Sequence, residues 1–186
     1  MNREEYLLKP FIDNADLMKD RVAAGIEANR KGRVHFRVVD KEGKPVPGVR
    51  IRYNQRTHDF HYGANLFMLD ELESDEKNAE YRRLFADAFN MATVPFYWSD
   101  LEPERGRPRF DKDSPRVYRR PAIDRCLEYC EANGVTPKEH CLVYDFFTPD
   151  WVPRDVDSIK RAYEERFRAL SERYAARIHG WEVINE

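Results

Sequence analysis

Residues 177–186 read RIHGWEVINE, and this closing segment decides how the rest of the chain is interpreted. Its short apolar run predicts a buried strand that brings Asn185 and Glu186 to its C-terminal end. Parallel barrels build their active sites at the C-terminal ends of the strands. If this strand belongs to such a barrel, the Glu186 carboxylate lies where the fold does its chemistry.

The chain before the closing segment alternates between strand patterns and helix patterns. Alternation of this kind predicts a parallel sheet with right-handed crossovers. A loop rich in Pro, Arg and Asp, at about 97–118, interrupts the series. The predicted order is a strand over 58–66, a helix capped by Ser74, a strand over 91–96, a helix from Pro121 to Gly134, a strand over 141–143, a helix over about 159–174, and a strand over 178–185.

These four β/α units predict an α/β fold that forms the N-terminal half of a TIM (β/α)8 barrel. A half barrel has unpaired edges and an uncovered interior face. A four-stranded open α/β sheet is the alternative, but no Gly-rich phosphate loop follows any strand to support a nucleotide-binding version.

Residues 1–57 predict an extension packed on the barrel domain, which spans 58–186. A helix is expected from about Ala15 to Arg30, with Gly32 just past its end. Alternating residues at 34–38 and 49–53, separated by a turn at 41–45, predict a β-hairpin with one buried face.

Composition excludes several classes of protein. The 186 residues are 41% hydrophobic, enough for a core, and charges of both signs are interspersed with a net charge of -2. We therefore expect neither nucleic acid nor a membrane as a partner. The start offers no apolar run long enough for a signal peptide, which predicts a cytoplasmic protein as written, or a secreted one if a leader has been removed.

The residues that could form disulfides, bind a metal ion or bind phosphate are interpreted as structural or solvated. Cys126, Cys130 and Cys141 suggest small buried residues and not a disulfide framework. His58 and His61 would point to opposite faces of a strand, so no metal or other cofactor is expected. The basic cluster of Arg116, Arg119 and Arg120 reads as a solvated loop.

Several motifs together resemble glycoside hydrolase family 10, the endo-β-1,4-xylanase family. Their order and spacing agree over about 58–186, and the ending of the closing segment is the most specific of them. Residues 31–62 also resemble an extension found before the barrel in some members. The motifs are FNMAT at 89–93, WSDLEPERG at 98–106, EHCLVY at 139–144, PDWV at 149–152 and WEVINE at 181–186.

The resemblance implies a (β/α)8 barrel that cleaves β-1,4-xylan with retention, with Glu186 as the general acid/base. It also implies sugar contacts from Asn185 and His140. Retaining hydrolysis needs two carboxyl groups about 5 to 5.5 Å apart, one protonated and one ionised. Their proximity helps to keep the acid protonated. A surface cap or salt bridge is the alternative role for an Asn-Glu pair at a strand end.

Aromatic residues are candidates for stacking on sugar rings, and here the motifs depart from the family. Trp98, Tyr144 and Trp151 could stack, and each could equally belong to the core; for Trp151 we expect packing under a loop. Glu102 reads as structural. Tyr144 and Asp145, both predicted to bind substrate, stand where the family usually has Trp-His.

Other glycone contacts also differ, because Thr93, Val94 and Tyr97 replace the usual Glu, Asn and Lys. The substrate is therefore expected to be a xylan-like polysaccharide or oligosaccharide. The family places the nucleophile on strand seven, so residues 1–186 are expected to be inactive without a missing C-terminal half. Another clan A glycosidase such as a β-xylosidase, and a non-catalytic carbohydrate-binding barrel, are the alternatives.

Overall fold

The computed structural model describes residues 2–186, which form two compact units. The first ends at Asn54 and the second is Gln55–Glu186. Among the described residues, no helix is long and apolar enough to cross a membrane, and no group of three or more His, Cys, Asp or Glu could hold a metal ion.

The first unit contains two helices, α1 (Arg3–Asp13) and α2 (Ala15–Asn29). The helix predicted from about Ala15 to Arg30 is confirmed as α2, whereas α1 was not predicted. Asn2 begins α1 with a capping box, because its side chain accepts a hydrogen bond from the Glu5 N–H at 2.7 Å while Glu5 accepts one from the Asn2 N–H at 2.9 Å.

The predicted hairpin in the first unit is wrong. Within residues 2–54, a single antiparallel bridge forms, between Val39 and Pro45, and the expected strands at 34–38 and 49–53 are irregular. The turn itself does form, since the Asp40 carboxylate accepts the Lys44 N–H at 2.8 Å. Two isolated strands are marginally stable unless one face is buried, and apart from the half-buried Val38 the apolar side chains of both segments are exposed.

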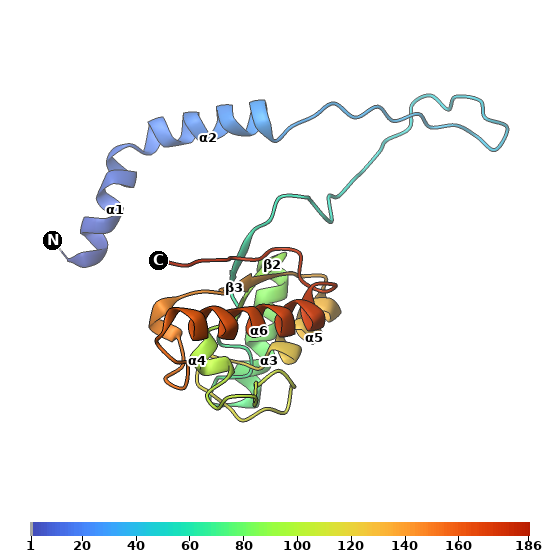
Figure 1. Ribbon diagram of the computed structural model, residues 1–186. Coiled ribbons are helices and arrows are strands. Elements are labelled where there is room, and N and C mark those ends of the chain that lie inside the picture. The colour runs from blue at the N-terminus through green and yellow to red at the C-terminus, as the bar shows by residue number, and fades with distance from the viewer. Residues whose placement is uncertain (1) are drawn as a thin grey trace. The chain divides into compact units, whose positions relative to one another are not determined.

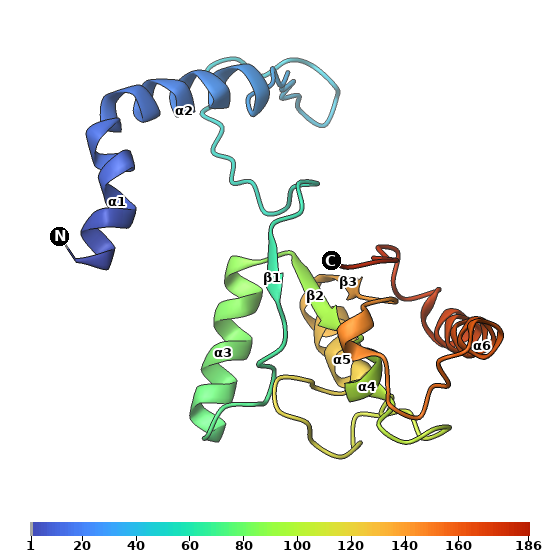
Figure 2. The ribbon, with the colours of Figure 1, turned by 60° about the vertical axis from the view of Figure 1, so that its left-hand side comes forward.

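The second unit is built on three parallel strands, β1 (Gly63–Asn65), β2 (Met91–Pro95) and β3 (Thr136–His140), in that spatial order. The connections are helical, as Figures 1 and 2 show. They contain α3 (Asp75–Ala88), the short α4 (Trp98–Leu101), α5 (Ile123–Asn133), the 3-10 turn η1 (Asp145–Phe147) and α6 (Val156–Tyr174).

Helix boundaries follow the predicted capping signals. The Ser74 hydroxyl accepts the Lys77 N–H at the start of α3. Gly134 ends α5 at φ 65°, the left-handed conformation that glycine adopts most easily. The helices place their apolar sides on one face of the sheet, where the core contains Phe85, Ala92, Val94, Phe96, Ile123, Cys126, Leu127, Cys130, Leu170 and Tyr174.

The closing segment lies beside β3 in the fourth parallel position, but it is not a regular strand. Parallel bridges join Lys138 to Gly180 and Val143 to Ile184. The Glu139 N–H also donates to the Gly180 carbonyl at 2.9 Å. The predicted strand at 141–143 is wrong in position, because β3 is the polar segment Thr136–His140, which pairs on both sides.

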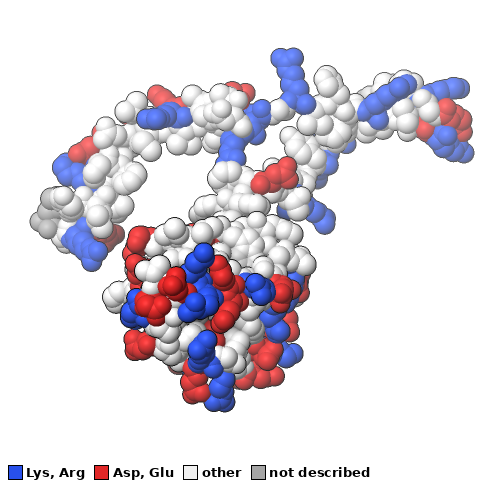
Figure 3. Space-filling view, viewed as in Figure 1, with Lys and Arg blue, Asp and Glu red and all other residues white. Residues whose placement is uncertain are grey.

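The visible face of this second unit carries acidic and basic side chains intermixed, as Figure 3 shows. The even mixture agrees with the absence of a basic field in the sequence. Charge therefore does not mark a site on this face, and the polar side chains of interest are at the edge of the sheet where the parallel strands end.

Candidate active site

Four predicted or neighbouring polar side chains meet at the C-terminal edge of the sheet. Tyr97 follows β2, His140 ends β3, Tyr144 lies four residues further on, and Glu186 ends the closing segment. Because these strands run parallel, their C-terminal ends lie on the same side of the sheet. Hydrogen bonds connect the four residues in two pairs.

Tyr144 forms the pair that includes the predicted acid/base. Its hydroxyl donates a hydrogen bond to Glu186 Oε2 at 2.7 Å. The bond raises the pKa of Tyr144, because an ionised phenol would lose it and would face the carboxylate. The Glu186 side chain is otherwise exposed to solvent.

His140 belongs to the other pair. Its Nε2 lies 2.9 Å from the Tyr97 hydroxyl, and its Nδ1 lies 3.1 Å from Glu182 Oε2. The imidazole ring also stacks against Phe67, with centroids 6.4 Å apart. The hydrogen bond at Nε2 and the stacking on Phe67 fix the direction of the ring, while Nδ1 is near the Glu182 carboxylate without a hydrogen bond.

Glu182 is a site residue that the sequence analysis missed. Its carboxylate receives a hydrogen bond from the Lys138 ammonium and lies against His140. The hydrogen bond from Lys138 is the main reason why the pKa of Glu182 is lowered, so the group is ionised. The alternation of side chains along a strand is a signal that could have identified Glu182. Residues separated by an even number of positions share one face of a strand, which places Glu182 with Glu186, and Lys138 with His140.

Glu139 was also not anticipated, and it points the other way. It is 0% exposed, lies between Lys138 and His140 on β3, and accepts a hydrogen bond from the Glu182 N–H at 3.0 Å. Burial raises its pKa to about 8. This carboxyl therefore ties the closing segment to β3 from the helix-covered side of the sheet.

Asn185 and Asp145, two further residues predicted to bind substrate, are next to Glu186 and Tyr144 in the sequence. Asn185 is half-buried, and its backbone N–H donates to the Val143 carbonyl at 3.0 Å. Asp145 is exposed at the start of η1, directly after Tyr144. Both flank the Tyr144–Glu186 pair along the chain, so they stay at this edge of the sheet.

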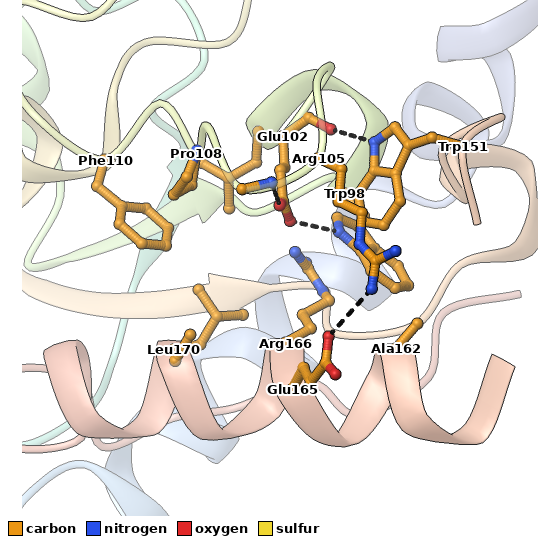
Figure 4. Close-up of a pocket in the computed structure, with 13 residues that line it drawn as sticks. Trp98, Glu102, Arg105, Pro108, Phe110, Trp151, Ala162, Glu165, Arg166 and Leu170 are labelled. Atoms are coloured by element: carbon orange, nitrogen blue, oxygen red, sulfur yellow. Dashed lines mark hydrogen bonds and ion pairs between the residues drawn. The ribbon is translucent and has the colours of Figure 1, made fainter. Parts of the chain in front are cut away.

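Trp98 lies in a different place, a cavity of about 240 Å³ between α4 and α6 (Figure 4). It is only 4% exposed, and its indole N–H donates to Glu102 Oε2 at 3.0 Å. Trp151 stands edge-on to it and donates to the Glu102 carbonyl at 3.0 Å. The expected packing role of Trp151 and the structural role of Glu102 are confirmed, whereas Trp98 is not brought together with Glu186.

Of the three clustered arginines, Arg120 is half-buried and structural, so the expectation of a solvated loop is wrong for it, whereas Arg116 and Arg119 are exposed as expected. Arg120 pairs with Asp100 at 2.7 Å, and its guanidinium lies 4.2 Å from the centre of the Tyr97 ring. Arg116 pairs with the buried Glu71 at 2.8 Å. The long loop is thereby pinned against the site.

The fold and the site together define a class of protein: part of a (β/α)8 barrel with ionisable groups at the C-terminal ends of its strands. The chain belongs to glycosyl hydrolase family 10, whose family model matches residues 59–186. The resemblance found in the motifs and the predicted fold class are both confirmed.

Individual relatives support the same family. The chain is 28% identical to endo-1,4-beta-xylanase 5 of Arabidopsis thaliana over 87% of its own length and 27% of that protein. It is 25% identical to the anti-sigma-I factor RsgI6 of Acetivibrio thermocellus over 90% of its own length and 21% of that protein.

Among solved structures, native xylanase 10B from Thermotoga maritima matches with a TM-score of 0.53 and 21% identity. The match covers 68% of this chain and 36% of that one. The chain thus spans about a third or less of the proteins it matches.

Proposed function

We propose that the protein containing this chain is a retaining glycoside hydrolase that cleaves β-1,4-linked xylan-like polysaccharide or oligosaccharide. The observation that carries the proposal is Glu186, an accessible carboxylate at the C-terminal edge of a parallel sheet, within a family 10 match. Such a carboxyl can protonate the leaving oxygen in the first step and activate water in the second.

The other residues of this edge have supporting roles in the proposal. We assign Asn185 and the ring of His140 to orienting the sugar next to the cleaved bond, because both are at this edge of the sheet. Glu182 is engaged by Lys138 and His140, so we assign it to positioning the imidazole and not to attack on the sugar. The nucleophile would come from a later strand, and residues 1–186 alone are expected not to turn over substrate.

The test uses a protein in which residues 1–186 are followed by the remaining β/α units of the barrel, and it replaces Glu186 with Gln. Glu186→Gln should lower kcat/KM on xylan by at least about 100-fold, because general acid catalysis contributes roughly that much or more. An aryl glycoside whose leaving group needs no proton should be largely spared in its first step. Glu172→Gln, on the exposed side of α6, is the matched control. Full activity of Glu186→Gln on xylan would contradict the assignment.

Two alternatives have their own readouts. A β-xylosidase would release single sugars from one end of a xylo-oligosaccharide ladder, whereas an endo-enzyme would release mixed lengths. A non-catalytic carbohydrate-binding barrel is favoured by one observation, that a relative bears the name of an anti-sigma factor and not of an enzyme. Binding of xylo-oligosaccharide without turnover by the continued chain would select that alternative.

A further inference from the structure

Tyr144 is the side chain that contacts the predicted acid/base, and its hydroxyl donates to Glu186 Oε2 at 2.7 Å. We propose that Tyr144 is a positioning residue, which holds the Glu186 carboxyl in the orientation needed for proton transfer. The inference rests on the proposed function. It assigns to Tyr144 a role beyond the ring stacking expected from its sequence position.

The Tyr144 ring is held by other aromatic rings. It immediately precedes η1, and its centroid lies 5.4 Å from that of Phe147 and 6.3 Å from that of Tyr97. Phe147 and Tyr97 in turn pack at 4.3 Å. Three rings from two loops thus meet at one point, so the hydroxyl is presented from a packed group.

An ion pair fixes the base of this aromatic group. Arg120 lies over the Tyr97 ring at 4.2 Å and is held by Asp100 at 2.7 Å. The Tyr97 hydroxyl is also engaged, 2.9 Å from His140 Nε2. Tyr97 therefore has contacts on its face, its edge and its hydroxyl, and it can serve as a rigid support for Tyr144.

Glu186 needs such support because its side chain is long and exposed. An unrestrained glutamate loses rotamer freedom when it must reach one oxygen atom of a substrate. Holding a catalytic group near its reacting geometry lowers that cost in advance. A hydroxyl donor suits this position, since it binds one carboxylate oxygen and leaves the other free for the proton transfer.

The experiment compares Tyr144→Phe with Tyr129→Phe in the chain continued through the remaining β/α units. Tyr144→Phe keeps the ring and removes only the hydroxyl. Tyr129→Phe is the matched control, because it also removes one short hydroxyl hydrogen bond, from Tyr129 to the Arg82 carbonyl at 2.6 Å, but on the helix-covered side of the fold.

Tyr144→Phe should lower kcat/KM about tenfold for a xylo-oligosaccharide or an aryl glycoside with a poor leaving group, the change that loss of one hydrogen bond produces. A dinitrophenyl glycoside, which needs no proton, should change less than about twofold in kcat/KM. Tyr129→Phe should show no such dependence on the leaving group. An equal effect of Tyr144→Phe on both substrates, or no effect, would overturn the proposal.

A second measurement uses residues 1–186 without any substrate. Spectrophotometric titration should show one tyrosine that ionises at higher pH than in Glu186→Gln, and Tyr144→Phe should remove it. Identical titrations would also overturn the proposal. Failure of the proposed function looks different, because Glu186→Gln would then remain active on xylan whatever Tyr144 does.

Discussion

Glu139 shows how a single buried carboxyl links pH to stability. It is fully buried, and burial raises its pKa from the ordinary value of 4.5 to about 8. Between these two values the folded chain keeps the proton while the unfolded chain releases it. The free energy of unfolding should therefore fall as pH rises through this window.

Glu139→Gln tests this residue-scale prediction. The amide cannot ionise and keeps an oxygen that can accept the Glu182 N–H. We expect the variant to lose less stability than the parent chain between about pH 5 and pH 8, measured as urea unfolding at several pH values. Glu172→Gln, at an exposed position, should leave the parent slope unchanged. Equal slopes for Glu139→Gln and the parent would contradict the prediction.

At the scale of elements, the close pairing of β1 and β2 depends on a glycine. A Cβ atom at Gly63 would lie 2.5 Å from the Met91 carbonyl oxygen, a backbone atom that cannot move without breaking the strand pair. A Cβ atom at Gly180, on the closing segment, would come no nearer than 3.5 Å to any atom, the Lys138 Cγ, which is an ordinary contact. The two glycines thus form a matched pair.

Gly63→Ala should lower the free energy of unfolding by about 2 kcal/mol or more, since overpacking of this kind typically costs 1 to 3 kcal/mol. Gly180→Ala should change it by less than about 1 kcal/mol. Denaturant unfolding of both variants measures the difference. Equal losses would show that β1 can shift away from β2 at little cost.

At the scale of the whole molecule, the closing segment pairs with β3 on one side, and no strand within Gln55–Glu186 pairs with its other side. Val183 and Ile184 on it are 56% and 71% exposed. An apolar edge of this kind pairs readily with another chain. We therefore expect the 186-residue chain to self-associate in a concentration-dependent way, measured by light scattering.

Ile184→Lys should reduce this association, because an edge lysine is a charge that must be buried on pairing. Lys substitution at Val156, an equally apolar residue that is 81% exposed at the start of α6, should have little effect. A monodisperse parent chain that unfolds cooperatively would contradict the prediction.

The amino-acid sequence by itself determined the alternation of strands and helices in the second unit, most of its helix boundaries and the family. Ser74, Gly134 and the apolar spacing in α5 and α6 act locally, within a few residues, so they can be read without a fold. The motif around Glu186 likewise indicates the family through residue types and order.

Only the tertiary structure decided where β3 lies, which helix faces meet the sheet and which side chains surround Glu186. The strand Thr136–His140 is polar and owes its conformation to partners on both sides. Glu182 meets Lys138, and Tyr144 meets Glu186, across about 40 residues of chain. Such contacts depend on strand register and loop packing, which long-range pairing sets and local propensity does not.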